Sequence, residues 1–148
     1  MENATITSAE WEVMRVVWAK STLTSREIID TLTNILDWKE GTIKSLLNRL
    51  VQKGFLKQDS SVKPMLYQAT ISAKEALQAD LNEIMARSCT KDRGLHIEQL
   101  IQHETLSREQ CQMLIQLIEE KMKNAPEIIK CQCPPGQCTC QHHTAIIE

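Results

Sequence analysis

The sequence predicts a mainly α-helical protein, in which a winged helix-turn-helix of three helices and a β-hairpin wing is followed by a helical dimerisation module and an irregular cysteine-rich tail. Three observations support this fold class. Capping-box patterns begin four runs of apolar residues, most of them with helical spacing. The spacing changes to that of strands around a polar turn at residues 59–64, and residues 131–140 hold four cysteines with no apolar pattern around them.

Three helices are predicted within residues 1–54. In a capping box a Ser or Thr side chain and a Glu or Gln three residues later satisfy each other's free backbone N–H groups. Such boxes begin at Thr7, Thr24, Ser72 and Ser107. The first helix is expected at about residues 8–19 and the third at about 39–53, where Gly54 is placed to end it. The side chains expected to form a shared core are Trp11, Met14, Trp18, Ile28, Ile29, Leu32, Leu36, Ile43, Leu46, Leu47 and Leu50.

A β-hairpin is predicted directly after these helices. Residues 55–58 and 65–70 have the composition of strands, and the polar segment 59–64 between them is typical of a turn. Three helices and a hairpin define a winged helix-turn-helix, so residues 1–71 are predicted to form a DNA-binding domain.

The segment from Ser72 to Asn124 is predicted to be helical again and to mediate dimerisation. Three helical segments with one apolar stripe each carry more hydrophobic surface than a short appendage readily covers by itself, which favours a homodimer. Asn124 and Pro126 end the last helix, and residues 125–148 form the tail. The stripe residues are Leu77, Leu81, Ile84, Met85 and Ser88, then Leu95, Leu100 and Ile101, then Cys111, Leu114, Ile115, Ile118 and Met122.

Positive charge is concentrated in one part of the chain. The net charge is −2, from 17 Lys and Arg against 19 Asp and Glu, yet residues 38–63 carry an excess of four positive charges. This local excess indicates that the helix at 39–53 enters the major groove of double-stranded DNA. The alternative is a solvated basic face on an ordinary three-helix core. The predicted DNA contacts are Thr42, Lys44, Ser45 and Arg49 on the helix, and Lys57 and Lys63 on the wing.

The tail sequence CQCPPGQCTC is predicted to bind metal. The two Cys-x-Cys pairs each point their thiols to one side of an extended backbone, and Pro134-Pro135-Gly136 turns one pair onto the other. Four thiolates suit tetrahedral Zn²⁺ or a compact Cu(I) cluster, and the short spacing within each pair favours copper. Disulfides or an inert tail are the alternatives. The predicted ligands are Cys131, Cys133, Cys138 and Cys140.

Other candidate residues point less directly to a site. Cys89 has no predicted role, and Cys111 fits the apolar stripe of its helix, which favours a buried core position. His142 and His143 follow the last tail cysteine and are expected not to be ligands, because four thiolates already suffice. The sequence has no nucleophile elbow, phosphate loop or HExxH motif, so an enzyme is not expected. It has no secretory signal and no membrane span either, which predicts a cytoplasmic protein.

Two stretches resemble the penicillinase-repressor (BlaI/MecI) family. They are DWKEGTIKSLLNRLVQKG at residues 37–54, which is similar to the recognition-helix region, and TSAEWEVMRVVW at residues 7–18, which is similar to the first helix. Together with the terminal Cys-x-Cys-x₄-Cys-x-Cys motif, they resemble the copper-responsive CopY branch of that family.

The resemblance implies a homodimeric repressor on a palindromic operator upstream of copper-export genes. It implies that one Zn²⁺ per chain accompanies DNA binding and that two Cu⁺ per chain, donated in the cell by a copper chaperone, displace the zinc and release the repressor. Two alternatives remain open. In the first, the tail is a permanent structural zinc clip in a repressor that senses another signal. In the second, the protein is mainly a copper buffer or carrier.

Overall fold

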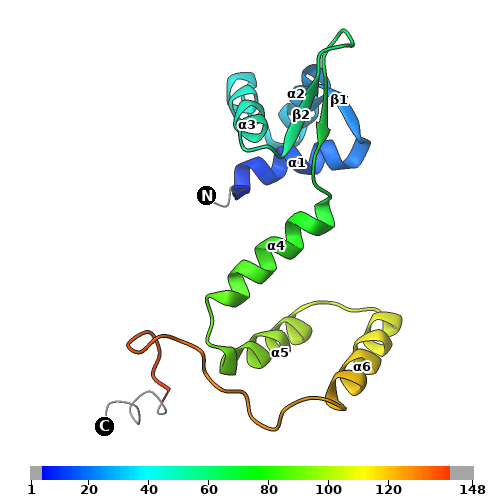
Figure 1. The fold of residues 1–148 in the computed structure, drawn as a ribbon. Coiled ribbons are helices and arrows are strands. Elements are labelled where there is room, and N and C mark those ends of the chain that lie inside the picture. Colours follow the sequence, from blue (N-terminus) through cyan, green and yellow to red (C-terminus); the bar gives the residue numbers. More distant parts are fainter. Residues whose placement is uncertain (1–4, 141–148) are drawn as a thin grey trace. The chain divides into compact units, whose positions relative to one another are not determined.

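Ten short elements make up the computed structural model, which describes residues 5–140. The chain divides into two compact units, 1–80 and 81–148, and the division falls inside α4. The predicted fold class is confirmed, whereas the predicted boundaries at 71/72 and 124/125 stay predictions. The elements are α1 (Ser8–Lys20), β1 (Thr22–Thr24), α2 (Ser25–Leu36), α3 (Glu40–Gln52), β2 (Leu56–Asp59), β3 (Leu66–Ala69), α4 (Ala73–Ala86), a short 3₁₀ turn η1 (Thr90–Asp92), α5 (Arg93–His103) and α6 (Arg108–Met122) (Figure 1).

The N-terminal unit is built around one apolar core shared by α1, α2, α3 and the sheet. The three helices pack against one another, and the sheet closes the core on α1 and α3 (Figure 1). Burial of these side chains is the main source of the unit's stability. The core side chains are Val13, Met14, Val17, Leu23, Ile28, Ile29, Leu32, Ile43, Leu46, Leu47, Leu50, Leu56 and Tyr67.

All four predicted capping boxes are present. Thr7, Thr24 and Ser107 each accept the N–H of the residue three positions on, and the side chain of that residue accepts the cap's own N–H. Ser72 and Glu75 make the same pair of hydrogen bonds ahead of α4. Each box satisfies two backbone donors that the first turn leaves free, so the helix starts are encoded locally.

The sheet contains a strand that the sequence pattern did not indicate. Its order is β1-β3-β2, with antiparallel pairing throughout. Leu23 of β1 lies opposite Tyr67 of β3, and Gln58 of β2 lies opposite the same tyrosine. Three residues are too few to display an alternating pattern, and β1 becomes a strand only because β3 supplies its hydrogen-bond partners. β2, β3 and the turn between them form the predicted wing.

The tryptophans of α1, which were predicted to belong to the core, lie at its edge. The buried face of α1 is formed by Glu10, Val13, Met14 and Val17. Trp11 and Trp18 are half-buried, their ring centroids 5.1 Å apart. Both indole N–H groups need a polar partner, and they donate to the Asp80 carboxylate at 3.1 Å and to the Ile71 carbonyl at 2.9 Å. The pair therefore joins α1 to Asp80, within α4, and to Ile71, just before that helix.

Gly54 ends α3 as predicted, in a Schellman motif. Its φ is +85°, the N–H of Gly54 donates to the Val51 carbonyl, and the N–H of Phe55 donates to the Leu50 carbonyl. A side chain at this φ is strained. Gly54→Ala should therefore lower the free energy of unfolding by about 1 kcal/mol, measured by urea denaturation.

Gly41→Ala is a matched control, for which the free energy of unfolding is expected to change in the opposite direction. Gly41 lies inside α3 with a helical backbone, and a Cβ placed there meets no atom within 4 Å. Gly41→Ala should stabilise the unit by about 0.5–1 kcal/mol. Equal effects of the two substitutions would contradict the role assigned to the left-handed φ of Gly54.

Large apolar side chains of the helices α4, α5 and α6 are exposed in the single chain. Cys111 is also exposed, so the predicted burial of this thiol within one chain is wrong. Exposed large apolar side chains that gather on a few helices are typical of a protein–protein interface. The exposed side chains are Leu77, Leu81, Ile84, Leu95, Ile97, Leu100, Ile101, Met113, Ile115, Leu117, Ile118 and Met122.

Candidate functional site

Helix α3 presents a polar face to solvent and an apolar face to the core. The alternation of buried and exposed positions follows the helical period, so burial of the leucines fixes which side chains point outward. Thr42, Lys44, Ser45 and Arg49 are all exposed. The Ser45 hydroxyl donates to the Gly41 carbonyl at 3.0 Å, one turn earlier. The predicted DNA contacts on α3 therefore lie on an accessible face.

Glu40 sets the charge at the start of α3. Its carboxylate accepts from the Lys44 ammonium at 2.8 Å and from the Arg26 guanidinium at 3.2 Å. The hydrogen bond from Lys44, then that from Arg26, lowers the pKa of Glu40. Part of the Lys44 charge is thus compensated by Glu40. Arg26 is an additional cation beside α3, supplied by α2 and lying outside the basic segment 38–63.

Lys53 faces inward, although it contributes to the positive excess of residues 38–63. Its ammonium lies 2.8 Å and 2.9 Å from the two carboxylate oxygens of Glu10 and donates to the Thr5 carbonyl at 3.0 Å. Glu10 is fully buried, so Lys53 serves the fold as the counter-charge of a buried carboxylate.

Four cations of the basic segment remain available to a polyanion. Within residues 5–140, no ion pair engages the side chains of Lys39, Arg49, Lys57 or Lys63. Lys57 is exposed on β2, and Lys63 is exposed in the turn of the wing. The arrangement places positive charge on the recognition helix and on the wing, the two elements with which winged helices contact duplex DNA.

A cluster of thiols forms the second candidate site, in the C-terminal unit. The tail turns at Pro134–Gln137, where the Gln137 N–H donates to the Pro134 carbonyl at 3.1 Å and Gly136 has a φ of +92°. This turn, the one predicted, brings the Cys131 and Cys138 sulfurs to 3.4 Å. The Sγ atoms of Cys131, Cys138 and Cys140 all lie within 4.8 Å of one another.

The spacing of these sulfurs fits a thiolate metal centre. Four sulfurs at about 2.3 Å from a tetrahedral Zn²⁺ lie about 3.8 Å from one another. The Cys131 and Cys138 sulfurs, 3.4 Å apart, are close to that value. Cysteines so close that form no disulfide within residues 5–140 need little movement to bind a soft ion, and they would supply either Zn²⁺ or Cu(I) with sulfur ligands.

Neighbouring thiols alter one another's protonation. The backbone N–H of Cys140 lowers the pKa of Cys138 by hydrogen bonding to its sulfur. Hydrogen bonds with Cys131 and with Cys138 respectively raise the pKa of Cys133 and of Cys140, each to about 12. Cys138 therefore ionises before Cys133 and Cys140, and a metal that binds these thiols must displace protons from them.

Cys89 belongs to the same cluster, and its place in the sequence carried no signal of this. It follows α4 and precedes η1, and its sulfur lies 3.8 Å from that of Cys140. The Sγ atoms of Cys89, Cys131 and Cys133 also lie within 4.8 Å of one another. Cys111 does not join the cluster, and His142 and His143 lie outside the described residues.

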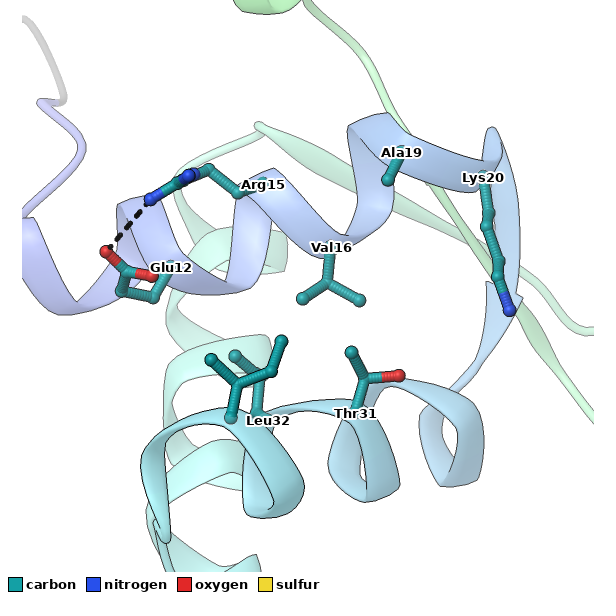
Figure 2. A pocket seen from close by; sticks show the side chains of 8 residues that line it. Glu12, Arg15, Val16, Ala19, Lys20, Thr31 and Leu32 are labelled. Carbon is teal, nitrogen blue, oxygen red and sulfur yellow. Dashed lines mark ion pairs between the residues drawn. The ribbon is translucent and has the colours of Figure 1, made fainter.

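The N-terminal unit has a groove between α1 and α2. Figure 2 shows its lining, with Val16 and Leu32 facing each other and an ion pair of 3.7 Å between Glu12 and Arg15 at one end. The residues drawn include no cysteine, histidine or cluster of carboxylates. It thus lacks the chemistry of a metal or catalytic site.

The fold and the exposed face of α3 define the class of this protein as a winged-helix DNA-binding protein. Within residues 5–140, no helix is long and apolar enough to cross a lipid bilayer. The chain belongs to the penicillinase repressor family, whose model matches residues 6–120. The predicted family is therefore confirmed. The match ends before the cysteine segment 131–140, so family membership leaves the chemistry of the tail open.

Several known proteins are similar to this chain. The "uncharacterized 16.5 kDa protein in ptsI 3'region" of Latilactobacillus sakei is 39% identical over 136 residues, covering 92% of this chain and 93% of that one. The penicillinase repressor of Bacillus licheniformis is 26% identical over 122 residues, covering 82% and 95%. The solution structure of the DNA-binding domain of the repressor BlaI is 31% identical, covers 50% of this chain and 90% of that one, and has a TM-score of 0.46. The family and its Bacillus licheniformis member are named as repressors and not as enzymes, as predicted for this chain.

Proposed function

We propose that this protein is a copper-sensing transcriptional repressor. As a homodimer it binds a palindromic operator through α3 and the wing when each tail holds Zn²⁺, and it leaves the DNA when two Cu(I) per chain displace the zinc. The observation that supports metal control most directly is the group of tail sulfurs, with Cys131 and Cys138 at 3.4 Å. The genes it represses would be those for copper export, and its compartment the cytoplasm.

DNA binding by a dimer is supported by two features that lie in different parts of the chain. The exposed cations Arg49, Lys57 and Lys63 supply phosphate contacts, and the hydroxyls of Thr42 and Ser45 supply contacts near the start of α3. The exposed apolar side chains of α4, α5 and α6 supply a surface for a second copy. A two-fold dimer then reads two half-sites, which accounts for a palindromic operator.

Metal exchange gives the tail a way to change shape. Zn²⁺ takes four sulfurs in a tetrahedron, whereas Cu(I) takes two or three and shares sulfurs with a neighbouring Cu(I). Because four thiolates with one Zn²⁺ carry the same net charge as four thiolates with two Cu⁺, a switch confined to the tail cysteines acts through geometry.

Cys138→Ser should abolish the copper response while operator binding is kept or weakened. The loss of one tail sulfur removes a ligand that one of the two Cu(I) ions needs. The measurement is fluorescence anisotropy of a labelled duplex from the protein's own promoter, bound by zinc-loaded protein and titrated anaerobically with Cu(I). In the unaltered protein release should saturate near two Cu(I) per chain.

Cys111→Ser is the matched control for this substitution, because Cys111 is an exposed thiol outside the cluster. It should respond to Cu(I) as the unaltered protein does. Undiminished DNA binding by the unaltered protein beyond two Cu(I) per chain would leave a repressor with a structural zinc clip. A failure of the zinc-loaded protein to bind the duplex would favour a copper buffer.

A further inference from the structure

We propose that Cys89 is a fifth ligand of the metal centre. This inference rests on the proposed binding of Cu(I) by the tail. Apart from Cys111, the described thiols fall into two overlapping groups of three, Cys89 with Cys131 and Cys133, and Cys131 with Cys138 and Cys140. Within each group the sulfurs lie within 4.8 Å of one another, and Cys131 is common to both. The five sulfurs thus form two adjoining triads.

The arrangement matches the coordination chemistry of Cu(I). A Cu(I) ion accepts two or three thiolates and can share a sulfur with a neighbouring ion. Two three-coordinate ions that share one sulfur require five sulfurs, and the tail supplies four. Cys89 supplies the fifth, so that each triad holds one Cu(I) and Cys131 bridges the two. Each thiol loses its proton as it binds.

A separate contact holds the tail against the residues around Cys89. The Thr90 hydroxyl donates to the Lys130 carbonyl at 2.7 Å, which joins the residue after Cys89 to the residue before Cys131. The turn that carries Cys89 is itself held, because the Asp92 N–H donates to the Cys89 carbonyl at 2.9 Å. The approach of Cys89 to the cluster therefore has support outside the sulfurs themselves.

Cys89 also differs from the tail cysteines in what it connects. It lies between the end of α4 at Ala86 and the start of η1 at Thr90, so it belongs to the helical part of the C-terminal unit. A metal bound to it is attached to the segment between α4 and α5 as well as to the tail. Cu(I) binding would in this way act directly on the helices whose apolar faces are proposed to form the dimer.

Protection from alkylation tests the proposal on the full-length, unaltered protein. The protein is loaded anaerobically with two Cu(I) per chain and exposed briefly to N-ethylmaleimide, and the modification of each cysteine is quantified by peptide mass spectrometry. Relative to the copper-free protein, alkylation of Cys89 should be slowed to the same extent as alkylation of Cys131 and Cys138.

The outcomes separate this inference from the function on which it rests. If the tail cysteines are protected but Cys89 reacts as fast as it does in the copper-free protein, the fifth ligand is refuted and copper binding by the tail stands. If the tail cysteines react as fast as they do in the copper-free protein, copper binding by the tail is refuted and the fifth ligand with it.

A second measurement uses Cys89→Ser against Cys111→Ser. Loss of a group that only positions a ligand typically costs 10- to 100-fold in metal affinity. Loss of Cys89 should therefore weaken binding of the second Cu(I) by at least about tenfold, measured in competition with the chromophoric chelator bicinchoninate. Unchanged affinity for both Cu(I) ions in Cys89→Ser would overturn the proposal. Cys111→Ser should match the unaltered protein.

Discussion

Replacement of Lys53 by methionine should destabilise the N-terminal unit by about 3 kcal/mol. The Glu10 carboxylate is fully buried, and the Lys53 ammonium contacts both of its oxygens. Methionine fills a similar volume but leaves a buried charge without a partner, and breaking a buried ion pair typically costs about 3–5 kcal/mol. The lower end applies here, because the Lys53 side chain retains 28% of its exposure and water screens the pair.

Urea denaturation followed by tryptophan fluorescence measures the unfolding of the N-terminal unit specifically. All of the tryptophans, Trp11, Trp18 and Trp38, lie in the N-terminal unit, so their emission reports its unfolding. Lys63→Met removes an exposed lysine that has no ion pair in the described chain, and it should change the free energy of unfolding by less than about 0.5 kcal/mol.

The double variant Glu10→Gln/Lys53→Met separates the buried charge from the lost contacts of the lysine stem. Glutamine is neutral and keeps an oxygen for the capping box with Thr7. Most of the loss in Lys53→Met should therefore be recovered. Equal destabilisation in the single and double variants would show that packing of the lysine stem, and not the uncompensated carboxylate, accounts for the effect.

Charge reversal at Arg49 should weaken operator binding by about 100-fold or more at 0.1 M salt. Arg49 is exposed on α3 and takes part in no ion pair within the described chain, so its charge is available to DNA. One arginine contact is worth about 1–3 kcal/mol, and a dimer loses it twice. Fluorescence anisotropy with the promoter duplex measures the affinity.

The salt dependence of binding identifies the kind of contact that Arg49 makes. If Arg49 contacts a phosphate in each half-site, the slope of log affinity against log salt for Arg49→Gln should be less steep by about 2. Arg15→Glu is the control, since Arg15 is an exposed arginine of α1 in a 3.7 Å pair with Glu12. Arg49→Glu binding as tightly as Arg15→Glu would contradict the assignment of α3 as the DNA-binding helix.

Features encoded by neighbouring residues were predictable from the sequence. The capping boxes, the end of α3 at Gly54 and the turn at Gly136 each depend on a few adjacent residues whose side-chain chemistry or backbone freedom is specific. The helical spacing of Ile43, Leu46 and Leu50 likewise determined which side of α3 is buried and therefore which side chains are exposed.

Features that depend on distant residues were not predictable in this way. In the sequence, Lys53 cannot be distinguished from the other cations of the basic segment. Only the fold brings Glu10, from another helix, to its ammonium. Cys89 reads as an isolated thiol, since nothing near it in the sequence resembles a ligand pair, and the contact with Cys140 arises only when the tail returns. In both cases a local pattern can supply the residue type but not its partner.

The position of the hydrogen bond between Thr90 and Lys130 indicates how a bound metal would affect the unfolded state of the C-terminal unit. It marks the place where the chain returns to itself after α5 and α6. A metal bound by both Cys89 and the tail would cross-link the chain there and close a loop that contains both helices. Closure of a loop of this length restricts the unfolded ensemble by up to about 4 kcal/mol. Metal occupancy would then slow amide hydrogen exchange in α5 and α6, neither of which contains a ligand.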